Sequence, residues 1–304
     1  MSAKRGHARI LHQCAISRRA SPIFALDQPL VQSVFVPLVA AFAVAGAGRL
    51  SRGLARTILC GAAIALGFLA AYTAIFGPPA ILPRSAGQKV AGLAVLAIVA
   101  GALVDAIRLG PATRRAVLLV AAATGLLWLL SPLLRAPDAI NLLRAAGALV
   151  LGLLIVWRAS EIAPDPQAAG PILVVAGVGL AGVALLGASV SLAQLAAALG
   201  AAAGGFMLWN WPVRRDSFEA AALLGGYGIL AALITQGMAY TRMNPAALAV
   251  LAGVIFAERI AKRAFPRASP QSASFALAVA GAALVPAAAA IALAYIFAGT
   301  RSPY

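Results

Sequence analysis

The sequence predicts an all-α fold, namely a polytopic integral membrane protein whose helical bundle has about ten transmembrane helices. Three observations predict it. The 304 residues are 62% hydrophobic and 11% charged, with a mean hydropathy of +0.95, so the chain has more apolar surface than one soluble core can bury. Apolar runs of bilayer length, about 20 residues, recur along the chain. The runs are continuous rather than alternating, which favours helices over a barrel.

The first half of the chain contains five of the predicted spans. Pro78, Pro79 and Pro83 separate the second span from the third, and Pro132 and Pro137 lie around the end of the fourth. Proline at these points removes a backbone donor and ends or bends a helix. The five spans cover residues 30–48, 54–76, 88–107, 116–134 and 139–157.

The second half contains five more spans. Asp165 and Pro166 mark a central loop, and Pro286 lies inside the last span, where we expect it to kink the helix. Gly200 and Gly204 form a pair of small residues four apart, a spacing that favours close helix packing. The ninth span is the shortest. These spans cover residues 171–188, 191–209, 217–240, 245–258 and 273–298.

The chain divides into a transmembrane domain, residues 30–298, and two tails. Residues 1–29 are basic and contain no run of spanning length, so they are predicted to be disordered or to lie on a surface. Residues 299–304 form a short C-terminal tail. A secretory signal, an organellar transit peptide and a start codon placed too far upstream are alternative interpretations of the first tail.

Basic residues are unevenly distributed between the loops. Thirteen follow the odd-numbered spans: Arg49, Arg52, Arg56, Arg108, Arg114, Arg115, Arg158, Arg214, Arg215, Arg259, Lys262, Arg263 and Arg267. The even-numbered loops and their flanks hold Arg84, Lys89, Arg135, Arg144 and Arg242. Short basic loops stay in the cytoplasm, so the odd loops are predicted inside and both termini outside. When the tails are counted as well, 13 basic residues lie on the predicted inside and 11 on the predicted outside. Two alternatives follow. Either the first tail stays in the cytoplasm and one predicted span is wrong, or the tail is absent from the mature or true protein.

Composition also indicates a location and a partner. Arg greatly outnumbers Lys, and Ala, Gly and Pro are abundant, which is typical of GC-rich bacterial coding and favours a bacterial inner membrane. The net charge of +16 lies mostly in short loops, so we expect contact with anionic lipid head groups and no nucleic-acid binding. Aromatic residues near span ends are interpreted as an interfacial belt: Tyr72, Trp128, Trp157, Trp209, Trp211 and Tyr240.

Residues that commonly carry enzyme chemistry are scarce. His7 and His12 both lie in the first tail, and Cys14 and Cys60 are too few and too far apart for a metal site. No HExxH, GxSxG or Walker pattern occurs, so no catalytic motif, cofactor or metal site is predicted. An intramembrane enzyme that modifies lipids with arginines at head-group level remains a hypothesis without a motif.

Charged residues within the spans avoid the predicted midplane. Each of three acids has a basic residue three or four positions away, which places both on one helix face and predicts local ion pairs at the interface. The pairs are Asp105 with Arg108, Glu219 with Arg215, and Glu258 with Lys262.

Arg144 is the exception, because it lies inside the start of the fifth span. Its side chain is expected either to extend to the head groups or to line a polar cavity within the bundle. The candidate cavity residues are Arg144, Asn141, Gln194, Gln236 and Asn244.

Two classes of function fit these observations. The first is a transporter for a small solute or a lipid-related molecule, since ten spans divide into two five-helix halves of opposite orientation. The second is a non-catalytic membrane subunit or scaffold, which the scarcity of polar residues near the midplane favours. A carrier should have a water-filled pocket near the midplane, whereas a scaffold should have a dry centre.

One stretch resembles a known family. Asn244-Pro245 and the following Gly253, Phe256 and Glu258-Arg259 are similar to the penultimate helix of EamA-like ten-helix exporters of drugs and metabolites. The resemblance covers about 16 residues, and the first half of the chain contains no matching helix. It implies an exporter as a further alternative.

Overall fold

The computed structural model describes residues 28–107, 109–135, 138–212, 216–266, 269 and 272–299. Within these residues every regular element is a helix, which confirms the predicted all-α class. In this described part of the chain, nine helices are long and apolar enough to cross a membrane. Most of the predicted first tail, residues 1–27, and residues 300–304 lie outside the described part of the chain.

The elements follow one another along the chain with short connections. The first span joins a π-helical turn, η1 (Val31–Phe35), to α2 (Val36–Leu50). The others are α3 (Gly53–Phe76), α4 (Ala86–Ile107), α5 (Pro111–Arg135), α6 (Ala139–Ile162), α7 (Pro166–Leu186), α8 (Val190–Trp209), α9 (Ala220–Leu223), η2 (Leu224–Gly228), α10 (Ile229–Tyr240), α11 (Pro245–Ala252), η3 (Gly253–Phe256), α12 (Ala257–Ala264) and α13 (Ala273–Gly299). The segment α9–η2–α10 forms one continuous span with a π-helical turn inside it.

The predicted ninth span is shorter than a bilayer and changes form part-way. The α-helix α11 ends at Ala252, the 3₁₀ turn η3 follows, and α12 begins at Ala257. The apolar part, residues 245–256, rises only about 20 Å, at about 1.5 Å per residue in α11 and about 2.0 Å in η3. It runs antiparallel to α13, because Asn244 lies near Phe297 and Gly253 faces Pro286. Within the described residues, this short segment therefore lies beside nine helices of bilayer length and is not itself one of them.

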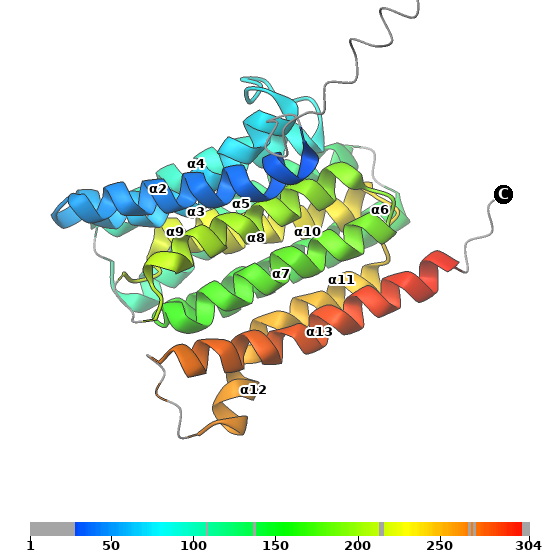
Figure 1. Ribbon diagram of the computed structural model, residues 1–304. Coiled ribbons are helices and arrows are strands. Elements are labelled where there is room, and N and C mark those ends of the chain that lie inside the picture. Colours follow the sequence, from blue (N-terminus) through cyan, green and yellow to red (C-terminus); the bar gives the residue numbers. More distant parts are fainter. Residues whose placement is uncertain are drawn as a thin grey trace, which may run out of the picture.

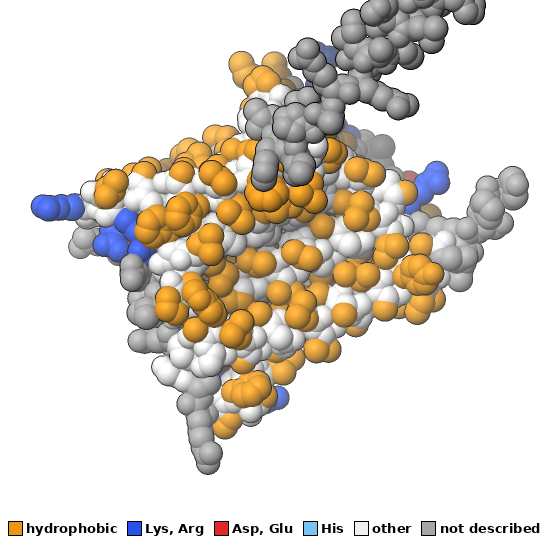
Figure 2. All heavy atoms as spheres, in the orientation of Figure 1, with side chains coloured by type: hydrophobic (Ala, Val, Ile, Leu, Met, Phe, Trp, Pro, Cys, Tyr) orange, Lys and Arg blue, Asp and Glu red, His pale blue; other side chains and the backbone are white. Residues whose placement is uncertain are grey.

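The helix α12 turns away from the direction of α11 and α13 (Figure 1). The reason is its composition: the charged side chains that begin at Glu258 cannot remain in hydrocarbon. Charged residues on the rest of the visible face also keep to the helix ends, and the middle is hydrophobic (Figure 2). We call the end that holds the loops after α2, α4, α6, α8 and α12 the charged end.

The segment α9–η2–α10 lies at the centre of the bundle and is buried along most of its length. The helices α3, α4 and α6 pack most closely against it, and α4, α5, α6 and α13 each expose one side. Three phenyl rings and a phenol fill the centre: Phe68, Phe206, Phe218 and Tyr227, none more than 2% exposed.

Close packing relies on small residues. A Cβ on Gly177 of α7 would lie 2.7 Å from the backbone nitrogen of Gly200 in α8, so these two helices touch through their glycines. Gly204, the second member of the predicted pair, meets nothing within 4 Å. Its neighbour Gly205 instead faces the carbonyl oxygen of Leu38, at 2.3 Å from a built Cβ. The predicted role in packing therefore belongs to Gly200 and Gly205.

Candidate functional site

Ion pairs at the charged end join helices that are distant in the sequence. Asp216, just before α9, accepts hydrogen bonds from Arg49 of α2 and from Arg56 of α3, whose Nη2 lies 2.6 Å from Oδ1. Arg49 also donates to the carbonyl oxygen of Trp209 over 2.9 Å. This network fixes the ends of α2, α3 and α8 to one buried carboxylate.

A second network joins α4, α5 and α9, and we call it the Arg114 clasp. The Asp105 side chain, 2% exposed, accepts hydrogen bonds from the backbone N–H groups of Ala220 and Ala221 over 2.9 and 3.1 Å. It thereby caps the first turn of α9 from another helix. Arg114 bridges Asp105 and Glu219 over 3.2 and 2.5 Å. Three helices are tied together at this point.

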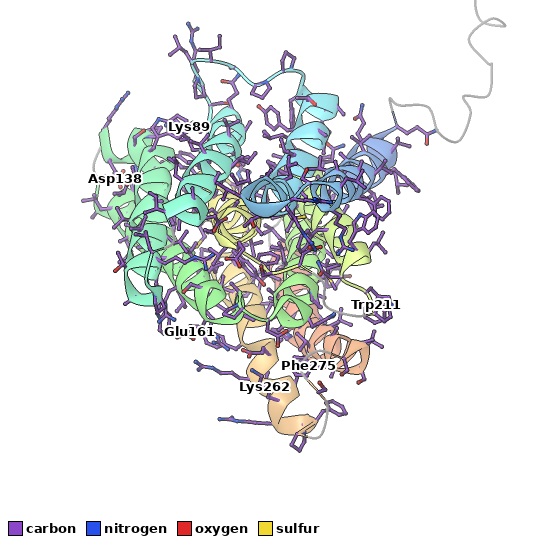
Figure 3. The ribbon with its side chains drawn as sticks, turned by 90° about the vertical axis from the view of Figure 1, so that its left-hand side faces the viewer. Lys89, Asp138, Glu161, Trp211, Lys262 and Phe275 are labelled. Atoms are coloured by element: carbon purple, nitrogen blue, oxygen red, sulfur yellow. The ribbon has the colours of Figure 1, made fainter. Side chains whose placement is uncertain are left out.

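A third network joins α6 to α12. Arg158, whose side chain is 4% exposed, donates to Glu161 over 2.6 Å and to Glu258 over 2.7 Å. Lys262 pairs with the second oxygen of Glu258, which confirms that predicted ion pair. Glu161 and Lys262 mark the two sides of this network in Figure 3, which looks onto the charged end.

The other two predicted ion pairs involve Arg108 and Arg215, which lie outside the described residues. The structure shows the partner that sequence spacing missed, because both Asp105 and Glu219 bind Arg114. Arg114 is nine residues from Asp105 along the chain, across the α4–α5 turn, so no helical spacing could suggest the pair.

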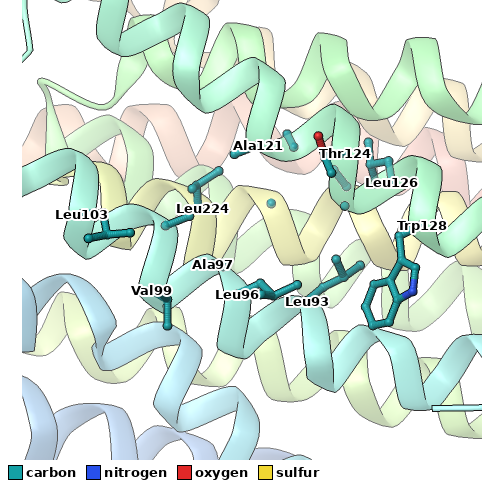
Figure 4. A pocket seen from close by; sticks show the side chains of 15 residues that line it. Leu93, Leu96, Ala97, Val99, Leu103, Ala121, Thr124, Leu126, Trp128 and Leu224 are labelled. Atoms are coloured by element: carbon teal, nitrogen blue, oxygen red, sulfur yellow. The ribbon is translucent and has the colours of Figure 1, made fainter. Parts of the chain in front are cut away.

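An open groove lies between α4 and α5, and we call it the lateral groove. Its volume is about 540 Å³. Figure 4 shows the side chains that line it. Its rim includes Leu96 and Leu103, which are more than half exposed, whereas its floor is formed by buried Leu224 and Ala231 of the central segment. Apart from Thr124, the side chains along it are aliphatic, or aromatic at Trp128. The groove can therefore accept an apolar ligand from the side of the bundle.

The π-helical turn η2 contributes Leu224 and Gly228 to the floor of the lateral groove. A π-helical turn adds a residue to one helical turn and is frequent at functional sites. The sequence Gly225-Gly226 within η2 lets it approach its neighbours closely, since a Cβ on Gly226 would lie 2.5 Å from the Leu173 side chain. The least regular part of the central segment is therefore the part that faces the groove.

At the far end of the lateral groove, Lys89 of α4 is 6% exposed. Its ammonium donates to the carbonyl oxygen of Trp128 over 2.8 Å and to the hydroxyl of Ser131 over 2.9 Å, both in α5. We call this contact the Lys89 clasp. The two clasps tie α4 to α5 on either side of the lateral groove.

Pro132 of α5 explains how the side chain of Lys89 can be buried at this position. Pro132 has no N–H, so the carbonyl of Trp128, four residues earlier, has no helical donor. Lys89 and the hydroxyl of Ser131 supply the hydrogen bonds instead. The buried ammonium and the orphaned carbonyl therefore satisfy each other.

A smaller pocket of about 410 Å³ lies at the charged end, between the start of α5, the end of α6 and the segment before α9. We call it the polar pocket. Its polar lining residues are Arg114, Arg115, Ser160, Glu161, Ser217 and Glu219. It lies at the same end of the bundle as the ion pairs, two of whose residues, Arg114 and Glu161, line it.

The five predicted cavity residues all lie near helix ends opposite the charged end. Asn141 and Asp138 pair with each other at the start of α6, and Arg144 is exposed. Gln194 is half-buried near the start of α8, and Asn244 caps α11 by accepting from the N–H of Ala246 over 2.8 Å. Asn244 also lines a pocket of about 10 Å³ beside α13.

Gln236 differs from the other four, because its Oε1 is buried and has no hydrogen-bond partner within the described residues. None of the five predicted cavity residues lines the lateral groove or the polar pocket. The shared polar cavity thus stays a prediction. The centre of the bundle is filled instead, and Tyr227 there donates its hydroxyl to the carbonyl of Ala169 over 2.6 Å.

The sequence placed Lys89 at the edge of the third predicted span, among the even-numbered loops and their flanks, and did not indicate the lateral groove. A lysine at the edge of an apolar run, together with a proline inside another run, was the available signal for the Lys89 clasp. Nothing comparable marks the groove, since its aliphatic lining is indistinguishable by type from lipid-facing residues.

No protein family matches this sequence, and no curated protein is significantly similar to it. The similarity of residues 244–259 to EamA-like exporters therefore stays confined to that stretch. Within the described residues, no three His, Cys, Asp or Glu side chains gather closely enough to hold a metal ion.

Proposed function

We propose that this multi-pass membrane protein carries a lipid-related molecule, which enters the lateral groove from the hydrocarbon side of the bilayer. The observation that supports this is the groove itself. Its volume of about 540 Å³ lies within the range of roughly 300–1,000 Å³ that ligand pockets occupy. Its aliphatic walls suit an acyl or isoprenoid chain and offer little to a polar solute.

The route is lateral because the centre of the bundle is closed. Phe206, Phe218 and Tyr227 pack edge to face there, with ring centroids 5.7 and 6.0 Å apart. A carrier for a polar solute needs polar groups beside a water-filled path near the midplane. An apolar ligand needs only access from the lipid, and the exposed rim at Leu96 and Leu103 provides it.

The two clasps make the lateral groove a defined opening rather than a loose gap. The Arg114 clasp and the Lys89 clasp hold α4 and α5 together at their ends. Between them the facing residues are small, such as Ala97, Ala121 and Gly125. Movement of α4 against α5 about these two fixed points would widen or close the groove.

The test is translocation of a fluorescent phospholipid across liposomes that contain the purified protein, measured by reduction of the outer-leaflet label with dithionite. Ala97→Phe fills the lateral groove, and we expect it to slow protein-dependent translocation at least fivefold. Val95→Phe is the matched control, because Val95 is 44% exposed on the same helix and lies outside the groove. Equal rates for both variants, or no acceleration over empty liposomes, would overturn the proposal.

The closed centre also favours a second candidate, a non-catalytic subunit or scaffold. A tagged chain purified in mild detergent would then retain a stoichiometric protein partner and translocate no lipid. A bacterial inner membrane with the charged end in the cytoplasm is part of both proposals, and neither includes a catalytic step.

A further inference from the structure

A second apolar groove runs along the outer surface between α5 and α6, and we call it the outer groove. Its volume is about 520 Å³. It is lined by Leu119, Val120 and Ala123 of α5 and by Val150, Leu153, Leu154 and Trp157 of α6. It is separate from the lateral groove, which lies between α5 and α4.

The outer groove and the polar pocket share the same two helices and adjoin each other. On α5, Leu118 lines the pocket and Leu119 lines the groove. On α6, Trp157 lines the groove, and Ser160, one turn later, lines the pocket and donates its hydroxyl to the carbonyl of Trp157 over 2.6 Å. A molecule with one polar end and one apolar chain could occupy both.

Among the described residues that line the polar pocket, one cation remains available. Arg114 is occupied by two acids, and Glu161 by Arg158 and Arg259. Arg115 is exposed and forms no ion pair with any described residue. An anionic group that enters the pocket therefore meets a guanidinium whose planar donors suit a phosphate.

The outer groove extends along about two thirds of the hydrocarbon depth of one leaflet. From Val150 to Trp157 the helix rises about 10 Å at 1.5 Å per residue, and the polar pocket adds the final turns of α6. Half of a hydrocarbon core of roughly 30 Å is about 15 Å. The polar end lies at the charged end of the bundle, so the orientation is that of a phospholipid in that leaflet.

We propose that the polar pocket and the outer groove together bind one phospholipid of the leaflet at the charged end. Arg115 pairs with the phosphate, the serine hydroxyls of the pocket lie beside the head group, and an acyl chain follows the outer groove past Trp157. This lipid is a resident ligand on the opposite side of α5 from the lateral groove, so its binding does not depend on the proposed transport.

Trp157 provides the readout, since it lines the outer groove. The experiment uses the full chain in nanodiscs with Trp128, Trp209 and Trp211 changed to Phe, so that Trp157 is the only tryptophan. Phospholipid with brominated acyl chains is titrated in as a quencher. A bound lipid gives quenching that saturates at a low mole fraction, whereas contact with bulk lipid gives quenching proportional to the mole fraction.

Arg115→Ala should weaken the saturable component at least tenfold, as expected for loss of a charged hydrogen bond. Arg263→Ala, another exposed arginine at the charged end, should leave it unchanged. Ala123→Phe fills the outer groove without altering charge and should abolish it. Unaltered thermal melting of the three variants excludes misfolding as the cause.

Two results would overturn the proposal: quenching that stays proportional to the mole fraction in the parent chain, or saturable quenching that Arg115→Ala leaves intact. In a further experiment, soluble glycerol phosphate is added as a competitor of the brominated lipid. If it displaces the brominated lipid as effectively as dioctanoyl phospholipid does, the site is one for free phosphate. No displacement by glycerol phosphate supports the phospholipid.

Discussion

Lys89 donates a hydrogen bond to the one carbonyl of α5, that of Trp128, from which Pro132 removes the helical donor. A costly buried ammonium on one helix therefore compensates for a break in the hydrogen bonding of another. The contact also fixes where α4 and α5 touch, and so where the lateral groove ends.

Lys89→Met should destabilise the protein by about 1–3 kcal/mol, since the carbonyl of Trp128 loses its charged donor and keeps only the hydroxyl of Ser131. Thermal unfolding in detergent measures the effect. In a Pro132→Ala background the restored N–H can bond to that carbonyl, so the cost of Lys89→Met should be clearly smaller. The same cost in both backgrounds would show that the lysine does not act through the carbonyl.

Asp105→Asn should destabilise the protein by about 2 kcal/mol, because a buried carboxylate that accepts two backbone N–H groups and one guanidinium loses its charge. Glu219→Gln should cost less than about 1 kcal/mol, because the Glu219 side chain is 30% exposed. Melting temperatures of the two variants show which change destabilises the protein more. A larger loss for Glu219→Gln would contradict the capping role of Asp105.

Breaking the buried pair between Arg158 and Glu258 should cost about 3–5 kcal/mol for either single change to leucine. The double change should cost much less than the sum, because no unpaired charge is left buried. Chemical unfolding of the two single variants and the double variant measures the coupling. Additive losses would show that the two side chains act independently.

Gly101→Ala should destabilise the protein strongly, since its Cβ would lie 2.3 Å from the Cα of Ala221. The obstructing atoms belong to the backbone of α9 and cannot rotate away. Gly204→Ala, which meets nothing within 4 Å, should be neutral or stabilise by up to about 1 kcal/mol through helix propensity. Similar melting temperatures for both variants would refute the close contact between α4 and α9.

A topology reporter fused after Tyr304 should report a C-terminus outside the cytoplasm, with the charged end inside. Alkaline phosphatase and green fluorescent protein fusions give opposite signals and check each other. Fluorescence of the second fusion, with an inactive phosphatase, would place the charged end outside.

The fold class and most span positions were predictable because a bilayer tolerates few alternatives to long apolar helices. The predicted ninth span, 245–258, coincides with helical structure, but it is not among the helices long enough to cross a membrane, and its 3₁₀ turn and the change of direction at Glu258 were not apparent. Local spacing identified Glu258 with Lys262, since both lie on one helix. It missed Arg114 and Lys89, whose partners lie on other helices and depend on how those helices pack.

The candidate sites were harder to predict from the sequence than the fold was. Apolar side chains such as Leu96 and Leu103 look the same whether they face lipid or line a groove, because both surroundings have the same polarity. Polar residues near apolar runs suggest a polar cavity, yet Asn141 and Asn244 form local hydrogen bonds at the ends of their own helices. The grooves arise from the spacing of α4, α5 and α6, which single-residue patterns do not encode.

The segment of residues 245–256 measures only about 20 Å, whereas a hydrocarbon core is roughly 30 Å thick. In a bilayer, lipids beside its exposed face, at Ala246 and Ala249, would have to compress or tilt to cover it, at a cost of fractions of a kcal/mol per Å of mismatch. We therefore expect the membrane to be thinner on this side of the molecule. The protein should accordingly prefer short-chain, fluid bilayers over thick, ordered ones.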